Sequence, residues 1–190
     1  STNKVVQDYK STPLEKKSLE VPYFSNPTID YVYKANITVY GNELTGIFIA
    51  KKINDTTHRV VFTTEFGNKL MDFEISETDF KVNFILEELD RKMVVNTLVN
   101  DFRLLLRRHY TISERFENND NNVYKALDKD KKNYLFVSKS TNKIFRIIHA
   151  SKRKDLINLF YTSENDIFAE KIVIQHQNIS LFLPKKRKNV

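Results

Sequence analysis

The chain has 190 residues, no cysteine, and 31 lysine and arginine residues against 24 aspartate and glutamate residues, for a formal net charge of +7 at pH 7. This length suits one domain with a real hydrophobic core, and the lack of cysteine excludes disulfides, thiol catalysis and cysteine-ligated zinc within this sequence. No stretch approaches the roughly 18 apolar residues of a membrane span. The charge indicates attraction to an anionic partner, but four of the positive charges belong to residues 185–188, so an ordinary soluble surface is the simpler explanation.

The first part of the chain predicts a polar lead-in followed by a meander of strands. Residues 1–22 are polar and charged without clear periodicity, as expected for a tether or linker. Alternating apolar and polar residues then predict strands over Tyr31–Tyr40, Leu44–Lys51, His58–Thr64 and Lys69–Ile75, each ended by Asn, Asp or Gly. Short polar turns join these segments, which favours antiparallel pairing.

A fifth strand is predicted over Asp79–Ile85, and after it the period changes to that of a helix. Apolar residues recur at steps of three to five positions over Glu87–Arg108, including Met93, Leu98 and Phe102. Acidic residues begin this segment and arginines end it, which complements the helix dipole. The sequence therefore predicts one long amphipathic helix in the middle of the chain.

The second part of the chain returns to strands after the polar turn Asn118–Asn122. Short polar connections again favour neighbouring antiparallel strands. The predicted strands are Val123–Leu127, Asn133–Ser138, Lys143–Ala150, Leu156–Thr162, Ile167–His176 and Ile179–Leu183. The expected fold class is mainly β with one long α-helix: a half-open antiparallel β-barrel whose concave face holds the helix as a lid.

Catalytic motifs are not found. The four histidines are scattered without a metal-ligand spacing, so a strand or surface role is the expected one for each: His58, His109, His149 and His176. With three glycines in all, a phosphate-binding loop has no basis. Asp128, Asp130 and Asn133 resemble a calcium loop, but the required Gly and Glu are missing, so we interpret them as a turn. We expect no enzyme activity, no catalytic residue, no metal and no cofactor.

Nucleic-acid binding is also not expected. Aromatic side chains that stack on nucleic-acid bases usually lie exposed, between basic residues. Here the aromatic residues fall mainly on the apolar side of predicted strands, as Tyr31, Tyr33 and Phe73 do. Core packing explains them more simply.

Three segments and their order carry a resemblance to a known family. They are YKANITVYGNELTGIFIAKK, HRVVFTTEFGNKLMDFEI and, after the lone helix and a second run of strands, EKIVIQHQNISLFLP. The pattern resembles the LolA/LolB-type lipoprotein-localisation fold, and most closely the LolB-like outer-membrane lipoproteins of Gram-negative bacteria. The resemblance covers about Tyr31 to Leu183 and implies one domain over residues 23–184, followed by a basic tail over residues 185–190.

The resemblance also implies a function. In that family a helix covers the apolar cavity of an incomplete barrel, and the cavity receives the acyl chains of a lipoprotein. It implies a lipid or an acylated lipoprotein as the partner, a membrane anchor on a cysteine upstream of this sequence, a location on the periplasmic face of the outer membrane, and a monomer.

One turn matches a feature of the family residue by residue. LolB proteins carry a protruding apolar residue before a glycine between the third and fourth strands, and Phe66 precedes Gly67 at that turn here. A large apolar side chain at a hairpin tip is suited to insertion into a membrane or a partner. The alternative is that Phe66 folds back onto its own sheet.

The alternation of the strands predicts which residues would line an apolar cavity. Burying an acyl chain stabilises the complex by about 0.8 kcal/mol per CH₂. The expected lining is Ile37, Ile47, Ile49, Met71, Phe73, Ile75, Met93, Leu98, Phe102, Ile144, Ile148 and Phe160. The same residues could instead form a filled core, which would make the protein a structural or interaction protein without a ligand. A third hypothesis is an acidic ligand bound by the basic tail.

Overall fold

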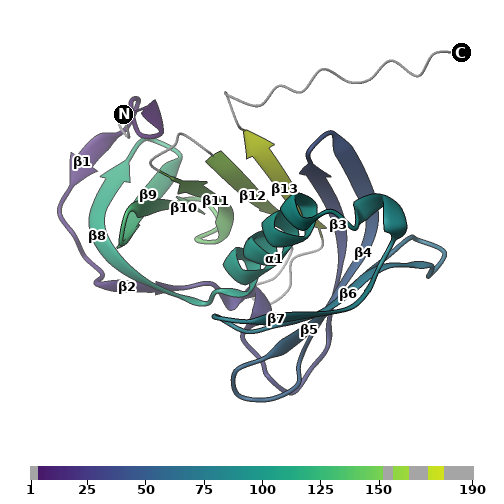
Figure 1. Cartoon of the computed structure of the whole chain (residues 1–190). Helices are drawn as coiled ribbons and strands as arrows, with labels where there is room; N and C mark the ends of the chain where they lie inside the picture. Colours follow the sequence, from purple (N-terminus) through teal and green to yellow (C-terminus); the bar gives the residue numbers. More distant parts are fainter. Residues whose placement is uncertain (1–3, 152–155, 163–170, 178–190) are drawn as a thin grey trace, which may run out of the picture.

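The computed structural model describes residues 4–151, 156–162 and 171–177. These residues form one thirteen-stranded sheet and a single α-helix, so the predicted mainly β class is confirmed. Figure 1 shows the helix α1 between two groups of strands, β3–β7 on one side and β8–β12 on the other. The predicted strand Ile179–Leu183 and the basic tail lie outside the described residues.

The first group of strands follows the sequence prediction closely. The meander consists of β3 (Tyr31–Val39), β4 (Asn42–Lys52), β5 (His58–Thr63), β6 (Lys69–Ile75) and β7 (Phe80–Ile85). Alternate residues of β3 are buried from Tyr31 to Val39, as period-two patterning requires. Gly41 and Gly67 adopt positive φ angles of 76° and 86° in the two tight turns, a conformation that favours glycine.

The second group comprises β8 (His109–Glu117), β9 (Asn121–Asp128), β10 (Lys131–Ser138), β11 (Ile144–Ala150), β12 (Leu156–Thr162) and β13 (Lys171–Gln177). The sequence analysis did not predict the first of these strands, β8. Tyr110 and Ile112 alternate into the core, but the pairing of β8 with β9 shifts register between Ile112 and Glu114. This irregularity interrupts the period-two signal.

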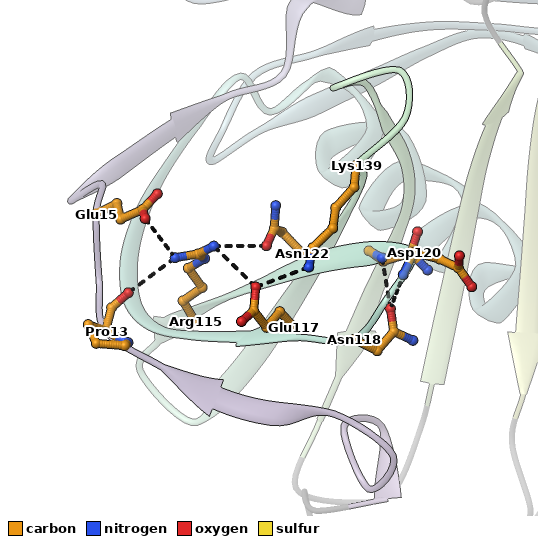
Figure 2. Close-up of polar contacts among 9 residues, drawn as sticks. Pro13, Glu15, Arg115, Glu117, Asn118, Asp120, Asn122 and Lys139 are labelled. Atoms are coloured by element: carbon orange, nitrogen blue, oxygen red, sulfur yellow. Dashed lines mark hydrogen bonds and ion pairs between the residues drawn. The ribbon is translucent and has the colours of Figure 1, made fainter.

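The polar lead-in is attached to the sheet. Its short strands β1 (Lys10–Thr12) and β2 (Ser18–Glu20) pair antiparallel with β8, and a short 3₁₀ helix, η2 (Pro22–Phe24), follows. Figure 2 shows Arg115 of β8 at the centre of a group of polar contacts, two of which, with Pro13 and Glu15, hold the lead-in on the strand. Its guanidinium donates to the Pro13 carbonyl (3.4 Å) and pairs with Glu15 (3.1 Å) and Glu117 (3.6 Å).

The sheet is open and contains one parallel pair. Its strand order is β1-β8-β9-β10-β11-β12-β13-β3-β4-β5-β6-β7, with β2 also on β8. The prediction of antiparallel pairing is correct for every described pair except β13 and β3, which run parallel. This pair joins the last described strand to the first strand of the meander, so the two halves of the chain form one continuous sheet.

The helix is shorter than predicted. A 3₁₀ turn, η3 (Glu87–Leu89), contains Glu87 and Glu88 of the expected first turn, Asp90 follows it, and α1 spans Lys92–Leu106. Leu98 and Phe102 of α1 are fully buried, whereas Met93 is 57% exposed. A step of five residues from Met93 to Leu98 rotates by about 140° on a helix of 3.6 residues per turn, which places Met93 off the buried face.

Apolar side chains gather on both faces of the sheet. The main core contains the buried face of α1 and the inward residues of both groups of strands. A smaller cluster on the other face consists of Val123, Tyr134, Phe136 and Ile148, covered by Val5, Val6 and Tyr9. The lead-in therefore protects the outer face of the second group of strands.

Candidate functional site

A wide cleft lies beside the C-terminal half of α1. Its volume is about 2040 Å³, larger than the several hundred Å³ of most ligand pockets. The turns β3–β4, β6–β7 and β9–β10 border it, together with the start of β8 and the ends of β11 and β13. The helix contributes Thr97, Asn100, Asp101, Arg103, Leu104 and Leu106.

Apolar and charged groups both line this cleft. Buried side chains of the main core reach it at Val39, Ile75, Leu104 and Leu106, and half-buried Ile157 adds to them. Five carboxylates and five Lys or Arg side chains accompany these residues: Glu20, Glu77, Asp101, Asp128 and Asp130 with Arg103, Arg107, Arg108, Lys129 and Lys131. The described lining is therefore amphipathic and close to neutral in charge when its histidines are neutral.

A buried carboxylate faces a histidine at the edge of the cleft. Asp101 of α1 is 0% exposed, and its Oδ2 lies 2.5 Å from Nε2 of His176 on β13. Its second oxygen, Oδ1, has no hydrogen-bond partner within the described residues. Burial raises the pKa of Asp101, and the contact with His176 opposes this rise. This contact fastens the helix to the strand that joins the two halves of the sheet.

The other three histidines line the same cleft. His149 of β11 contacts Asn133 Oδ1 through Nδ1 at 2.6 Å, and burial together with the charge of Lys131 lowers its pKa to about 4. Burial also lowers the pKa of His58, with Lys52 and Arg108 adding to the effect. Sequence spacing gave no sign that the four histidines come together, because they belong to four different strands.

Two arginines fix the C-terminal end of the helix. Arg103 donates from Nε to the Ser76 carbonyl at 2.7 Å. Arg107 donates to Asp128 at 2.8 Å and its guanidinium lies 4.2 Å from the ring centre of Tyr110. Asp128 ends β9 and Asp130 lies in the turn between β9 and β10, as interpreted from the sequence, whereas Asn133 lies buried in β10. Among the described residues, no group of three or more His, Cys, Asp or Glu side chains has a metal-binding arrangement.

Seven of the twelve predicted cavity residues pack together in the main core. They are Ile37, Met71, Phe73, Ile75, Leu98, Phe102 and Ile144. The ring of Phe102 lies 5.4 Å from that of Phe48 and 6.1 Å from that of Phe73 between centroids. The helix therefore fills the space between these side chains, and among the twelve residues Ile75 alone lines the cleft.

The other five predicted cavity residues lie elsewhere. Ile47 and Ile49 are half-buried and point to the face opposite Phe48, and Phe160 occupies the outer face of β12, within 5.1 Å of the Arg146 guanidinium. Ile148 belongs to the smaller outer cluster, and Met93 is exposed. Because β4 is apolar on both faces, its sequence could not indicate which face would meet the helix.

The hairpin tip between β5 and β6 presents Phe66 to solvent. The side chain is 95% exposed, so it does not fold back onto the sheet. Gly67 follows it at φ 86°, and the Gly67 amide donates to the Thr64 carbonyl at 2.9 Å. The turn thus holds the aromatic ring away from the body of the protein.

Comparisons with known proteins give no identity for the chain. No family model, no curated protein and no solved structure matches it. Within the residues that the structure describes, no helix is long and apolar enough to cross a membrane. The resemblance to the LolB-like proteins thus depends on the order and pattern of the elements alone.

Proposed function

We propose that the protein binds an amphiphilic molecule, a lipid or the acyl chain of a lipoprotein, in the cleft beside α1, without catalysing a reaction. The observation that supports this proposal is the cleft of about 2040 Å³ with apolar side chains and charged groups along its lining. An acyl chain contacts the apolar side chains, and the polar head meets the charged ones. We place the ligand in this cleft and not between the helix and the sheet, because the packing of Phe102 against Phe48 and Phe73 fills the space there.

The finer architecture belongs to the same proposal. The open sheet acts as a half-open barrel, and α1 acts as its lid, held at Asp101 by His176 and at Arg103 by Ser76. The anchored, outer-membrane location follows from the resemblance, and the protein works there as a carrier or acceptor of acylated molecules.

The chain offers a direct test because it contains no tryptophan. Asn100→Trp places a single fluorophore on the helix in the lining of the cleft, and Met93→Trp places one on the same helix outside the lining. Added oleate should shift and enhance the emission of the Asn100→Trp protein and leave that of the Met93→Trp protein unchanged. Native mass spectrometry of the unaltered protein should show the bound amphiphile. A clean apo mass and no change in either emission would refute lipid binding.

A second candidate function has its own support. The packed contact of Phe102 with Phe48 and Phe73 favours a filled core, as expected for a structural or interaction protein without a ligand. This function would be favoured if native mass spectrometry showed no bound ligand and the Phe66 hairpin captured a partner protein.

We also propose that Phe66 inserts into a membrane. Because its ring is 95% exposed, insertion into a bilayer removes apolar area from water without unpacking the fold. In the Phe66→Trp protein, the emission maximum of the single tryptophan should shift to shorter wavelength when phosphatidylcholine vesicles are added. An unshifted spectrum would show that the hairpin stays in water.

A further inference from the structure

The two halves of the sheet differ in how their outer faces are covered. In the second group of strands, Val5, Val6 and Tyr9 cover the outer apolar cluster. In the first group, Val32 of β3 points outward and is 59% exposed. Antiparallel sheets commonly leave one face to water, so the side chains on this outer face decide what it can bind.

A row of apolar side chains crosses this outer face. The pairing register places Val32 opposite Ile49, and Ile49 opposite Val61. All three lie on the face opposite the helix, since Tyr33, Phe48 and Phe62 of the same strands are buried in the main core. A water-facing strand surface has no need of three successive β-branched apolar residues in one cross-strand row.

Positive charges surround this row. Six Lys or Arg side chains occupy outward positions of β13 and β3–β7, against three carboxylates: Lys34, Lys51, Arg59, Lys69, Lys81 and Lys171 against Glu43, Asp72 and Glu74. Asp72 is 1% exposed and is held by both Arg59 and Lys69, at 2.6 and 3.0 Å. Lys51 and Lys81 lie 3.9 Å from Asp30 and Glu74, so the excess positive charge of this face comes mainly from Lys34 and Lys171.

Two lysines on this face lie directly beside each other. Lys34 of β3 and Lys171 of β13 are register partners in the parallel pair, and both are exposed. Like charges opposite each other on neighbouring strands destabilise a sheet. An anionic partner that lies across both strands would relieve this repulsion.

We infer that this open face, formed by Val32, Ile49 and Val61 with the six surrounding cations, docks on an anionic phospholipid surface. Apolar residues bordered by basic residues are the composition of membrane-surface binding elements, in which the apolar part enters the interface and the cations meet the lipid phosphates. The docking goes beyond ligand binding in the cleft, since neither the cleft nor Phe66 supplies its residues.

Vesicle sedimentation with the full chain tests the inference. The probes are vesicles of phosphatidylcholine alone and of phosphatidylcholine and phosphatidylglycerol in equal parts. We expect binding to the mixed vesicles that weakens as salt increases. Because each basic residue near an anionic surface contributes about fivefold to the affinity, the double variant Lys34→Gln, Lys171→Gln should bind about 25-fold more weakly.

Matched variants separate this face from other sources of charge. Lys16→Gln with Lys17→Gln removes the same charge from exposed positions of the lead-in and should leave binding unchanged. Val32→Gln changes no charge and should weaken binding by removing apolar area from the row. Circular dichroism of each variant confirms that the fold is retained.

Three results would overturn the inference. The first is equal binding to neutral and anionic vesicles. The second is an equal loss in the two double-lysine variants, or a loss only when the four basic residues of the tail (185–188) are changed to glutamine. The third is binding to heparin or single-stranded DNA without binding to vesicles, which would make the occupant a soluble polyanion. The Asn100→Trp emission with oleate is independent of all three, so failure of the docking and failure of the cleft proposal are distinguishable.

Discussion

The carboxylate of Asp72 gives the most quantitative prediction for the stability of the sheet. Its side chain is 1% exposed on β6, and its two oxygens accept hydrogen bonds from Arg59 (3.0 and 2.6 Å), Lys69 (3.0 Å) and Asn83 (3.3 Å). The bonds from Arg59, followed by those from Lys69 and Asn83, lower the pKa of Asp72 from 3.8 to about 2, although burial opposes the change.

This pKa sets a magnitude and a pH range. A decrease from 3.8 to about 2 corresponds to about 2.4 kcal/mol of additional stability when the group is ionised. Arg59 and Lys69 are about half exposed, so solvent screening reduces the expected value to about 1–2 kcal/mol. The folded protein releases the proton more readily than the unfolded chain, so this stability is complete above pH 3.8 and is lost as the pH falls towards 2.

The perturbation is Asp72→Asn, which keeps the shape and removes the charge. Urea unfolding at neutral pH should show a free energy of unfolding lower by about 1–2 kcal/mol than that of the wild type, and the difference should shrink as the pH approaches 2. Glu74→Gln on the same strand is the control, because Glu74 is partly exposed and its partner Lys81 lies 3.9 Å away. The control should change stability by less than about 0.5 kcal/mol. Equal stability of Asp72→Asn and wild type at neutral pH, or a gap that does not depend on pH, would refute the reasoning.

Three further substitutions test the core, the sheet and the helix contact. Phe102→Ala should lower the free energy of unfolding by about 3–5 kcal/mol, and exposed Met93→Ala by less than about 0.5 kcal/mol; similar values in urea unfolding would contradict the buried face of α1. Gly46→Ala should cost about 1–3 kcal/mol, because a Cβ there would lie 1.9 Å from the Thr63 carbonyl oxygen, and a melting temperature equal to the wild type would exclude that close approach. Asp101→Asn should gain stability relative to wild type as the pH rises above 3.8, since the raised pKa makes the folded wild type bind protons more tightly than the unfolded chain; a gap that stays constant over the pH series would contradict this.

The elements that the sequence predicted well are those with a strong local signal. Alternation from Tyr31 to Val39, ended by Gly41, specifies both a strand and its buried face. The three-residue strands β1 and β2 are too short to show a period, and their pairing with β8 depends on contacts such as that of Arg115 with Pro13. Local sequence carries no information about such distant partners.

The structure places the β4 residues of the predicted cavity on the outer face for a physical reason. Ile47, Phe48 and Ile49 are all apolar, so period two is compatible with either face pointing to the core. The register with β3 decides the matter, because Tyr33 lies opposite Phe48 and both are buried. The side chains of Ile47 and Ile49 then belong to the outer face, where Ile49 joins the row that we propose as a membrane-docking surface.

The cleft was not predictable because it is a product of topology. Its histidines come from β5, β8, β11 and β13, and no spacing along the chain relates them. The parallel pairing of β13 with β3 brings His176 beside the helix that follows the meander, where it meets Asp101. The helix itself fills the middle of the sheet with Leu98 and Phe102 and ends at Leu106. The four histidines, which the sequence presents as scattered strand or surface residues, therefore line the cleft, and seven of the residues that it presents as a cavity lining belong to the main core.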